Sequence, residues 1–371
     1  MKISVLRTDE KITFKLRELY KDWGYVQYRV GKFEEYDLYM QNKNFLASEQ
    51  ILTFSDTNGK LMALKPDITL SIIKNTKDDG VTKKLFYSEN VYRVPKNAYG
   101  FKEIMQTGLE CIGEVDRFST AEVLMLAAES LKTISESYVL DISHVGIVSG
   151  VLEGEAISSS AKEAIIDAVS NKNLHACELL CENSGVSEIG RELLSALITV
   201  SGAPNEVIEK MSVLSLPEES RNALTELSQL VKALSIYGDF NINIDFSVVN
   251  DMDYYSGIVF KGFVEGIPTG VLSGGRYDNL MTKMGKKSGA IGFAVYLDQL
   301  ERFMTESRSY DVDTLIVYDD DSDIGMVIRE AKKIKEEGRS VRVQQGKADG
   351  IRSRVTLFAD QAEMKEVNPN D

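Results

Sequence analysis

The 371-residue chain has few cysteines, and it has no long apolar run. Three cysteines, Cys111, Cys177 and Cys181, are too few and too scattered for a disulfide framework, so we expect reduced thiols in a cytoplasmic protein. No apolar run approaches the roughly 20 residues that cross a bilayer. The apolar stretch at the N-terminus is also too short for a signal peptide. These shortages exclude a disulfide-stapled secreted domain and a membrane protein.

Basic residues are also fewer than acidic ones. The chain has 43 Lys and Arg against 57 Asp and Glu, which gives a formal net charge of -14. Nucleic acid is bound largely through Lys and Arg that neutralise its phosphates. An acidic surface repels a polyanion overall, although it also serves solubility and leaves room for a local basic patch. The charge therefore argues weakly against a protein that binds tRNA.

The common cofactor motifs are missing as well. The sequence contains no dinucleotide-binding glycine pattern, no P-loop and no zinc-protease HExxH pattern. His175, Cys177 and Cys181 have the residue types of a metal site, but they lie in a helical pattern and lack a fourth ligand. We therefore predict neither a metal nor a cofactor.

The patterns that are present predict strands, then helices, then strands along the chain. A helix is expected from about Thr8 to Trp23, capped by Asp9, and the pair Asn58-Gly59 predicts a hairpin turn. A second helix is expected just after Ser119, which would cap it. A strand is expected over Tyr138–Val151. This order is typical of an α+β protein with an antiparallel sheet.

The order of elements also suggests two domains. The pattern is almost wholly helical from about 154 to 237, and strands resume directly afterwards, so this stretch is interpreted as a helical insertion in a sheet domain of residues 1–305. A strand, a helix and a strand follow at 310–371, which predicts a small α/β unit.

Three segments have compositions that point to chemistry. The first reads Leu64-Lys65-Pro66-Asp67-Ile68-Thr69. In an extended chain, Asp67 and Thr69 would project from the same side, and a carboxylate beside a hydroxyl can hold an ammonium group. The alternative is an ordinary junction between a strand and a helix that Asp67 or Thr69 caps.

In the second segment, Gln106 and Glu110 follow Arg93 and are four residues apart. That spacing places them on the same side of either a helix or a strand, so an amide and a carboxylate would share one pocket. A pair on the surface is the alternative.

The third segment runs from Tyr254-Tyr255 through Gly274-Gly275-Arg276-Tyr277-Asp278 to Gly289–Ala294. Paired tyrosines offer a flat wall and a phenol to an aromatic ligand. The double glycine allows a close approach of the backbone to a ligand.

Together the segments LKPDIT, NVYR, QTGLECIG, DYYSG, GGRYDNL and GAIGFA resemble the catalytic domain of histidyl-tRNA synthetases and their non-catalytic paralogues, over about Thr8 to Phe303. The resemblance implies a class II synthetase-type antiparallel sheet flanked by helices, in a homodimer. The segment FEEYDLY resembles the dimer-forming motif, with Gly31 where a proline is usual. The resemblance implies the following histidine-binding residues: Asp67, Thr69, Arg93, Gln106, Glu110, Tyr254 and Tyr255.

The resemblance also exposes departures from a working synthetase. Arg93 matches one conserved arginine, but the glutamate that follows it in the family is missing, and Gly100 stands in place of another arginine. Two further arginines align with Asn250 and Gln299. Losing one preorganised electrostatic donor costs about 3–4 kcal/mol, so both losses would slow the reaction roughly 10⁴- to 10⁶-fold. We therefore expect no catalytic residues and no aminoacylation.

Among the paralogues, this profile is similar to that of regulatory subunits of the short form of ATP phosphoribosyltransferase. That similarity implies a short catalytic subunit as partner in a hetero-oligomer, histidine as feedback effector, no tRNA, and a truncated C-terminal unit. Two alternatives stay open: a functional histidyl-tRNA synthetase, and an amino-acid-sensing module with another partner.

Overall fold

The computed structural model describes residues 6–43, 46, 50–94, 100–249, 254–303, 310–347, 350–360 and 363–367. The chain divides into two compact units, Met1–Met304 and Thr305–Asp371. None of the helices in these residues has the length and apolar character needed to span a membrane. Cys111, Cys177 and Cys181 are all buried free thiols.

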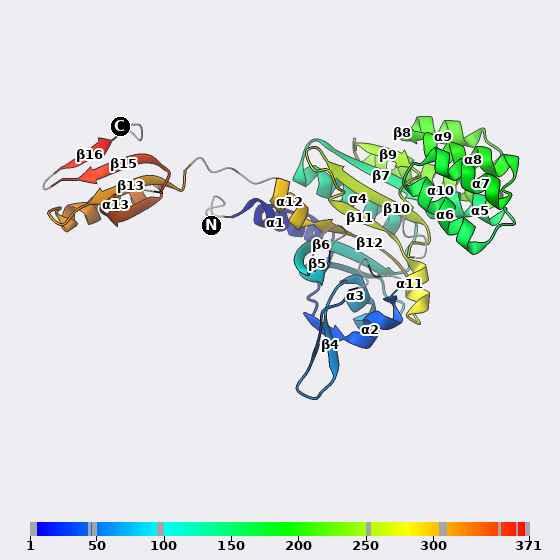
Figure 1. Ribbon diagram of the computed structural model, residues 1–371, viewed down its shortest axis with the longest axis horizontal. Helices are drawn as coiled ribbons and strands as arrows, with labels where there is room; N and C mark the ends of the chain where they lie inside the picture. Colours follow the sequence, from blue (N-terminus) through cyan, green and yellow to red (C-terminus); the bar gives the residue numbers. More distant parts are fainter. Residues whose placement is uncertain are drawn as a thin grey trace. The chain divides into compact units, whose positions relative to one another are not determined.

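The first unit is built on a sheet in which nine described strands are hydrogen-bonded side by side (Figure 1). In sheet order they are β1 (Val26–Gln27), β5 (Lys83–Arg93), β6 (Lys102–Gly113), β12 (Gly289–Tyr296), β11 (Leu272–Arg276), β10 (Ile258–Val264), β7 (Tyr138–His144), β9 (Ile242–Asp245) and β8 (Ser201–Gly202). The pairs β1–β5 and β7–β9 are parallel, and the other pairs are antiparallel. The α+β class and the synthetase-like sheet predicted from the sequence are confirmed.

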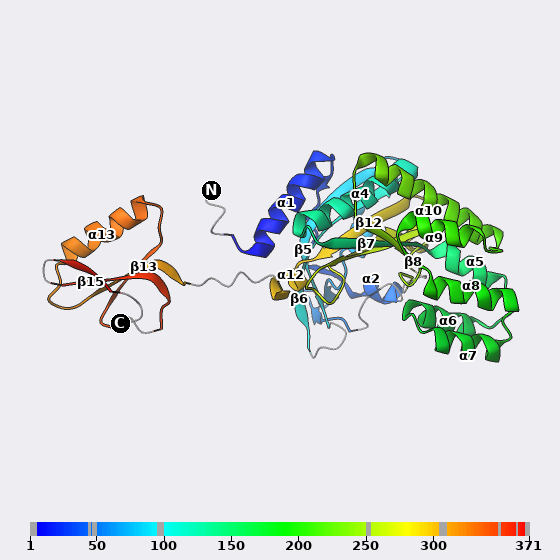
Figure 2. The same ribbon diagram turned by 90° about the horizontal axis from the view of Figure 1, so that it is seen from above.

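Helices cover one face of this sheet and form the larger core with it. They are α1 (Thr8–Asp22), α4 (Arg117–Ile134), α10 (Glu218–Tyr237) and α12 (Leu297–Phe303). Figure 2 shows α1, α4 and α10 lying along the same side of the strands. Strand residues alternate in their direction, so Leu109 and Cys111 of β6 enter this core.

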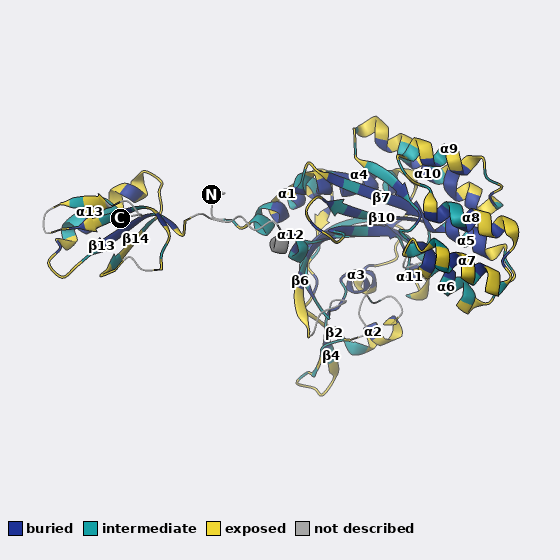
Figure 3. Ribbon diagram, turned by 45° about the horizontal axis from the view of Figure 1, so that its top comes forward, coloured by how far each residue is buried: buried dark blue, intermediate teal, exposed yellow. Residues whose placement is uncertain are grey.

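The helical insertion lies at one end of the sheet (Figure 1). Within the expected bounds of 154–237 it contains α6 (Ser159–Ser170), α7 (Leu174–Ser184), α8 (Glu188–Thr199) and α9 (Pro204–Ser212), and it ends with α10; α5 (Val145–Glu153) comes directly before it. Their apolar residues continue the larger core, and in Figure 3 their outward turns are exposed.

A second, smaller core covers the opposite face of the sheet. The elements on this side are β2 (Phe33–Glu35), α2 (Tyr36–Gln41), β3 (Thr53–Ser55), β4 (Leu61–Leu64), α3 (Thr69–Asn75) and α11 (Asp278–Lys283). β3 and β4 form the predicted hairpin, and Asp56 closes its turn by accepting from the backbone N–H groups of Asn58 and Lys60 at 2.8 Å each. The candidate site lies on this face.

The C-terminal unit contains β13 (Val312–Tyr318), α13 (Ile324–Glu336), β14 (Val341–Gln345), β15 (Ser353–Ala359) and β16 (Met364–Val367). Its described strands pair in the order β14-β13-β15-β16, and only the β15–β16 pair is antiparallel. The strand, helix and strand expected from the sequence are all present, with two further strands after them.

Some local predictions were wrong. The strand expected over Tyr138–Val151 ends at His144, where the His144 Nδ1 atom accepts from the backbone N–H of Gly146 and caps α5. A short apolar run does not distinguish a strand from a buried helix, which is why the pattern failed here. The caps were misplaced too: Asp116 caps α4, not Ser119, and α1 starts after Arg7, not Asp9.

Candidate functional site

Glu110 is the centre of the candidate site. Its neighbours Leu109 and Cys111 face the helical core, so Glu110 projects from the opposite face of β6 and is only 2% exposed. The Thr69 hydroxyl donates to its Oε1 atom at 2.7 Å, and the Tyr277 hydroxyl donates to its Oε2 atom. A buried carboxyl group thus has partners for both oxygens.

The pKa of Glu110 is raised to about 8: burial is the main cause and the nearby Asp67 carboxylate adds to it, whereas the hydrogen bonds from Tyr277 and Thr69 lower it. Removal from water disfavours the charged form, and the bonds compensate only in part. Glu110 is therefore protonated at neutral pH, and it can exchange a proton with a ligand.

The segment that carries Asp67 and Thr69 is a helix start. α3 begins at Thr69, and Asp67 Oδ1 accepts from the backbone N–H of Leu70 at 2.8 Å. The capping alternative is therefore realised, and the two residues do not lie side by side on an extended strand. The helix start nevertheless turns the Thr69 hydroxyl to Glu110, so both residues reach the site. Burial raises the pKa of Asp67, against its bond from Leu70 and the charge of Arg93.

Gln106 and Glu110 lie on strand β6, so the two-residue alternation places them on one face of the sheet. Gln106 is 5% exposed, which excludes the alternative of a surface pair. Arg93 ends the neighbouring strand β5, and its charge acts on Asp67. The structure thus gathers these residues on the side of the sheet that carries the smaller core.

The paired tyrosines form a wall beside the buried carboxyl group. The rings of Tyr254 and Tyr255 meet edge to face with centroids 4.7 Å apart, and the ring of Tyr277 lies 5.6 Å from that of Tyr254. Burial raises the pKa of Tyr254 and of Tyr277 well above the usual value, so both phenols stay neutral. Tyr277 was missed as a site residue from sequence, although it stands inside the GGRYD motif.

Two glycines make room for these side chains. A Cβ atom on Gly292 would overlap Glu110 Oε2, and one on Gly275 would come within 2.6 Å of the Tyr255 ring. Glu110, Gly292 and Gly275 are register partners across β6, β12 and β11. The double glycine therefore accommodates side chains of the protein itself.

We predict that Gly292→Ala destabilises the protein by about 2–4 kcal/mol, because the new methyl group displaces the buried Glu110 carboxyl. Urea unfolding measures the change. Gly154→Ala is the matched control, since its Cβ would meet only ordinary contacts beyond 3.5 Å. Equal stability of the two variants would contradict the packing described for Gly292.

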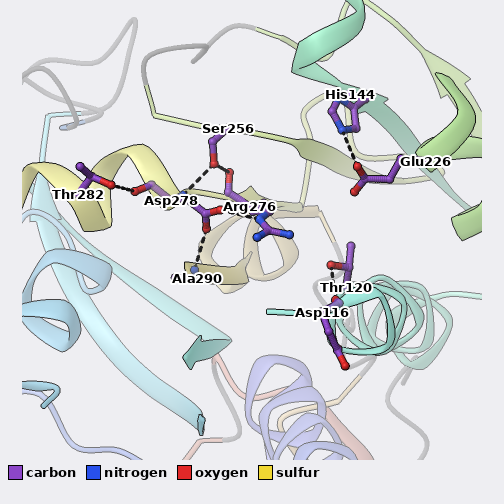
Figure 4. A network of polar contacts seen from close by, with 9 residues as sticks. All are labelled: Asp116, Thr120, His144, Glu226, Ser256, Arg276, Asp278, Thr282 and Ala290. Atoms are coloured by element: carbon purple, nitrogen blue, oxygen red, sulfur yellow. Dashed lines mark hydrogen bonds and ion pairs between the residues drawn. The ribbon is translucent and has the colours of Figure 1, made fainter. Parts of the chain in front are cut away.

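A polar clasp around Asp278 holds the two motifs together (Figure 4). Its carboxylate accepts from Arg276 Nε at 2.7 Å and from the backbone N–H of Ala290 at 3.0 Å. Its own backbone N–H donates to Ser256 Oγ at 2.8 Å, and the Ser256 N–H donates to the Arg276 carbonyl at 2.8 Å. The clasp fixes the residues that flank Tyr255 and Tyr277.

On the opposite face, His144 Nε2 lies 3.5 Å from Glu226 Oε2, and this interaction lowers the pKa of Glu226 (Figure 4). Neither residue faces Glu110, since β7 pairs His144 with Ile258, whose side chain enters the helical core. This pair belongs to the scaffold.

Of the two further positions where an arginine of the synthetases is replaced, Asn250 and Gln299, the structure describes Gln299. At the position of one expected arginine, Gln299 accepts from Thr269 Oγ1 at 3.2 Å and donates to Asp298 Oδ2 at 3.0 Å. A neutral amide bound to its neighbours brings no positive charge to a phosphate. Asn250 lies outside the described residues. In the part of the chain that the structure describes, no three His, Cys, Asp or Glu side chains are grouped to hold a metal ion.

The fold and the site are those of a class II aminoacyl-tRNA synthetase-like protein. The family model described as histidyl-tRNA synthetase matches residues 4–300. Among solved structures, an ATP phosphoribosyltransferase regulatory subunit/histidyl-tRNA synthetase from Bacillus halodurans is similar, with a TM-score of 0.75 and 26% identity over 95% of this chain and 94% of that one.

Comparison with curated relatives places the chain more specifically within this class of proteins. An ATP phosphoribosyltransferase regulatory subunit of Alkaliphilus metalliredigens is 30% identical over 295 residues, 78% of this chain and 74% of its own length. An ATP phosphoribosyl transferase (HisG:HisZ) complex from Thermotoga maritima shares the fold, with a TM-score of 0.62 at 20% identity over 78% of this chain and 97% of that one. The chain belongs to the histidyl-tRNA synthetase-like family, in the branch of non-catalytic ATP phosphoribosyltransferase regulatory subunits of histidine biosynthesis.

Proposed function

We propose that this regulatory subunit binds histidine in the pocket around Glu110 and passes that signal to a short catalytic subunit. The effector then inhibits the first step of histidine biosynthesis. The proposal concerns the effector, its site and the partner. It rests on chemical complementarity between the described side chains and the imidazole ring and ammonium group of histidine.

The buried carboxyl group of Glu110 carries the proposal. An imidazole ring has one nitrogen that donates and one that accepts a hydrogen bond. A carboxyl group that holds a proton near pH 7 can pair with either form of the ring, and Thr69 and Tyr277 keep it oriented. The flat wall of Tyr254 and Tyr255 suits an aromatic ligand.

The amino end of the ligand has partners as well. Asp67 brings a carboxylate, and Thr69 and Gln106 bring polar oxygens on the same side of the sheet. A charge-assisted hydrogen bond to an ammonium group is about twice as strong as a neutral one. Arg93 stands close enough to influence Asp67 and balances its charge.

We further infer a homodimer within the hetero-oligomer. The segment that resembles the dimer-forming motif contains β2 and α2, where Phe33 is 54% exposed and packs only partly on Phe54, 5.0 Å between ring centroids. Val26 of the short edge strand β1 is 66% exposed. Histidine that binds one arrangement of the dimer more tightly would bias the catalytic subunit docked on it.

The test is co-expression with a short catalytic subunit of ATP phosphoribosyltransferase. We expect a stable complex whose mass by light scattering contains the regulatory chain in pairs. Its activity with ATP and phosphoribosyl pyrophosphate should depend on this chain and fall with histidine. Asp67→Ala should keep the complex and lose the inhibition.

The alternatives give other results. A synthetase would charge tRNA with histidine in the absence of any partner. An amino-acid-sensing module with another partner would bind histidine and form no complex with the catalytic subunit. Either result would overturn the proposed function.

A further inference from the structure

A cavity of about 420 Å³ lies beside the site, on the same face of the sheet. It shares Tyr255 with the site, and β10 and β11 supply Lys261 and Ser273 to its lining. Asp141, which is the register partner of Lys261 on β7, and Asp245 of β9 also line the cavity. The volume is within the range of cavities that hold small ligands.

Lys261 lies across from Asp141 in this cavity, but its ammonium group forms no close ion pair with a described carboxylate. Among the described residues, no carboxylate oxygen lies within 4 Å of its Nζ atom, which sits 5.5 Å from the centre of the Phe263 ring. The other nearby lysine differs, since Lys172 Nζ binds Asp245 Oδ2 at 2.6 Å. A partly buried ammonium group normally has a partner, because burial of an unpaired charge is unfavourable.

The strand register shows that Lys261 and Glu110 project from one face. Lys261 pairs with Ser273, Ser273 with Ala294, and Ala294 with Gly108. Gly108 lies midway between Gln106 and Glu110 on β6. The two strands that carry Lys261 and Glu110 are three spacings, or about 14 Å, apart. Two side chains that project from one face at this separation leave room for an amino acid between their strands.

We propose that Lys261 binds the carboxylate of the histidine effector while Glu110 binds its imidazole ring. The inference rests on the proposed function and adds a residue to its site. A cation in this place favours an effector with an anionic end and disfavours one without it. Lys261 is thus a specificity-determining residue for amino acids over their amino-alcohol analogues.

Two other assignments of charge compete with this one. Lys261 also acts on Asp141, whose pKa burial raises and Lys261 lowers, so the lysine could serve only to balance that carboxylate. Alternatively, Arg93 alone could receive the carboxylate of histidine, since its charge reaches Asp67. The assignments differ in which variant loses the preference for a ligand that carries a carboxylate.

The experiment compares two ligands by calorimetry on the full chain. L-Histidine has the carboxylate, and L-histidinol has a hydroxymethyl group in its place. For Lys261→Gln we expect histidine to bind about 10- to 100-fold more weakly, the effect of losing a charged hydrogen bond, and histidinol to bind as it does to the wild type. Lys172→Gln removes a charge near the same cavity and should change neither affinity by more than about two-fold.

Three results would overturn the inference. If Lys261→Gln weakens both ligands equally, the lysine acts through Asp141 or the fold. If Lys261→Gln retains the preference for histidine and Arg93→Gln loses it, Arg93 alone holds the carboxylate. In both cases the proposed function stands, because histidine still binds the wild type. If the wild type binds neither ligand, the proposed effector fails together with the inference.

Discussion

Glu110→Gln is expected to abolish histidine binding and at the same time to stabilise the protein at neutral pH. The amide keeps the shape and the oxygen that Thr69 or Tyr277 can donate to, but it cannot exchange a proton with an imidazole ring. We expect at least a 100-fold loss of affinity, as for the removal of a charged or proton-sharing partner from a buried site. Stability and binding would then change in opposite directions.

The stability change follows from the raised pKa. In the folded chain Glu110 holds its proton up to a pKa of about 8, whereas the unfolded chain loses it near the ordinary value of 4.5. The contribution to stability is therefore fully present below pH 4.5 and is lost as the pH rises to about 8. At pH 7.5 the glutamine variant should be more stable by about 2–4 kcal/mol, because it does not titrate.

Urea unfolding of the wild type and Glu110→Gln between pH 4.5 and pH 9 measures this difference. The two chains should have similar stability at pH 4.5 and diverge up to about pH 8. The other titrating groups cancel in the comparison. A constant difference across the range would show that Glu110 is ionised in the folded chain, against the geometry described.

The second large effect is a bell-shaped dependence of histidine affinity on pH. Free imidazole titrates near pH 6.5 and Glu110 near pH 8, so between these values the two groups hold one proton in total before and after binding. Below pH 6.5 both hold a proton, and one must leave for the pair to form. Above pH 8 neither the ring nor Glu110 holds this proton, and one proton must be taken up on binding.

Each limb should fall by about ten-fold per pH unit, with a plateau from about pH 6.5 to pH 8. Asp67 steepens the acid limb, because burial raises its pKa too and its carboxylate must be ionised to hold an ammonium group. Calorimetry from pH 5.5 to pH 9 in two buffers of different ionisation enthalpy counts the protons. Flat affinity with no proton exchange would exclude Glu110 as the partner of the ring.

The sequence was sufficient for those parts of the site that depend on spacing alone. Gln106 and Glu110 are four residues apart, and this places them on one face whatever the element, so β6 confirmed the shared face. Asp67 and Thr69 show the limit of the same argument. Their spacing suggested an extended chain, but α3 already begins at Thr69, and a hydrogen bond from the Leu70 N–H to Asp67 decided the local geometry.

Long-range contacts were not predictable in this way. Tyr277 reaches Glu110 across 167 residues of sequence, and no local pattern distinguishes that phenol from the tyrosines at 254 and 255. No pattern in the sequence pointed to Lys261, because its proposed role depends on the register across four strands. The helix α5 was missed since its apolar residues fill the core on every side, which removes the periodicity that marks a surface helix.

The clasp around Asp278 bears on how the function of such a protein can change during evolution. It joins the tyrosine loop to β11 and β12, and the partners described for it all come from these sheet segments. The helices α6–α9 supply none of them. Mutations in that insertion can therefore accumulate without disturbing the clasp. A lineage can alter what the insertion contacts and still keep the tyrosine loop fixed to the sheet.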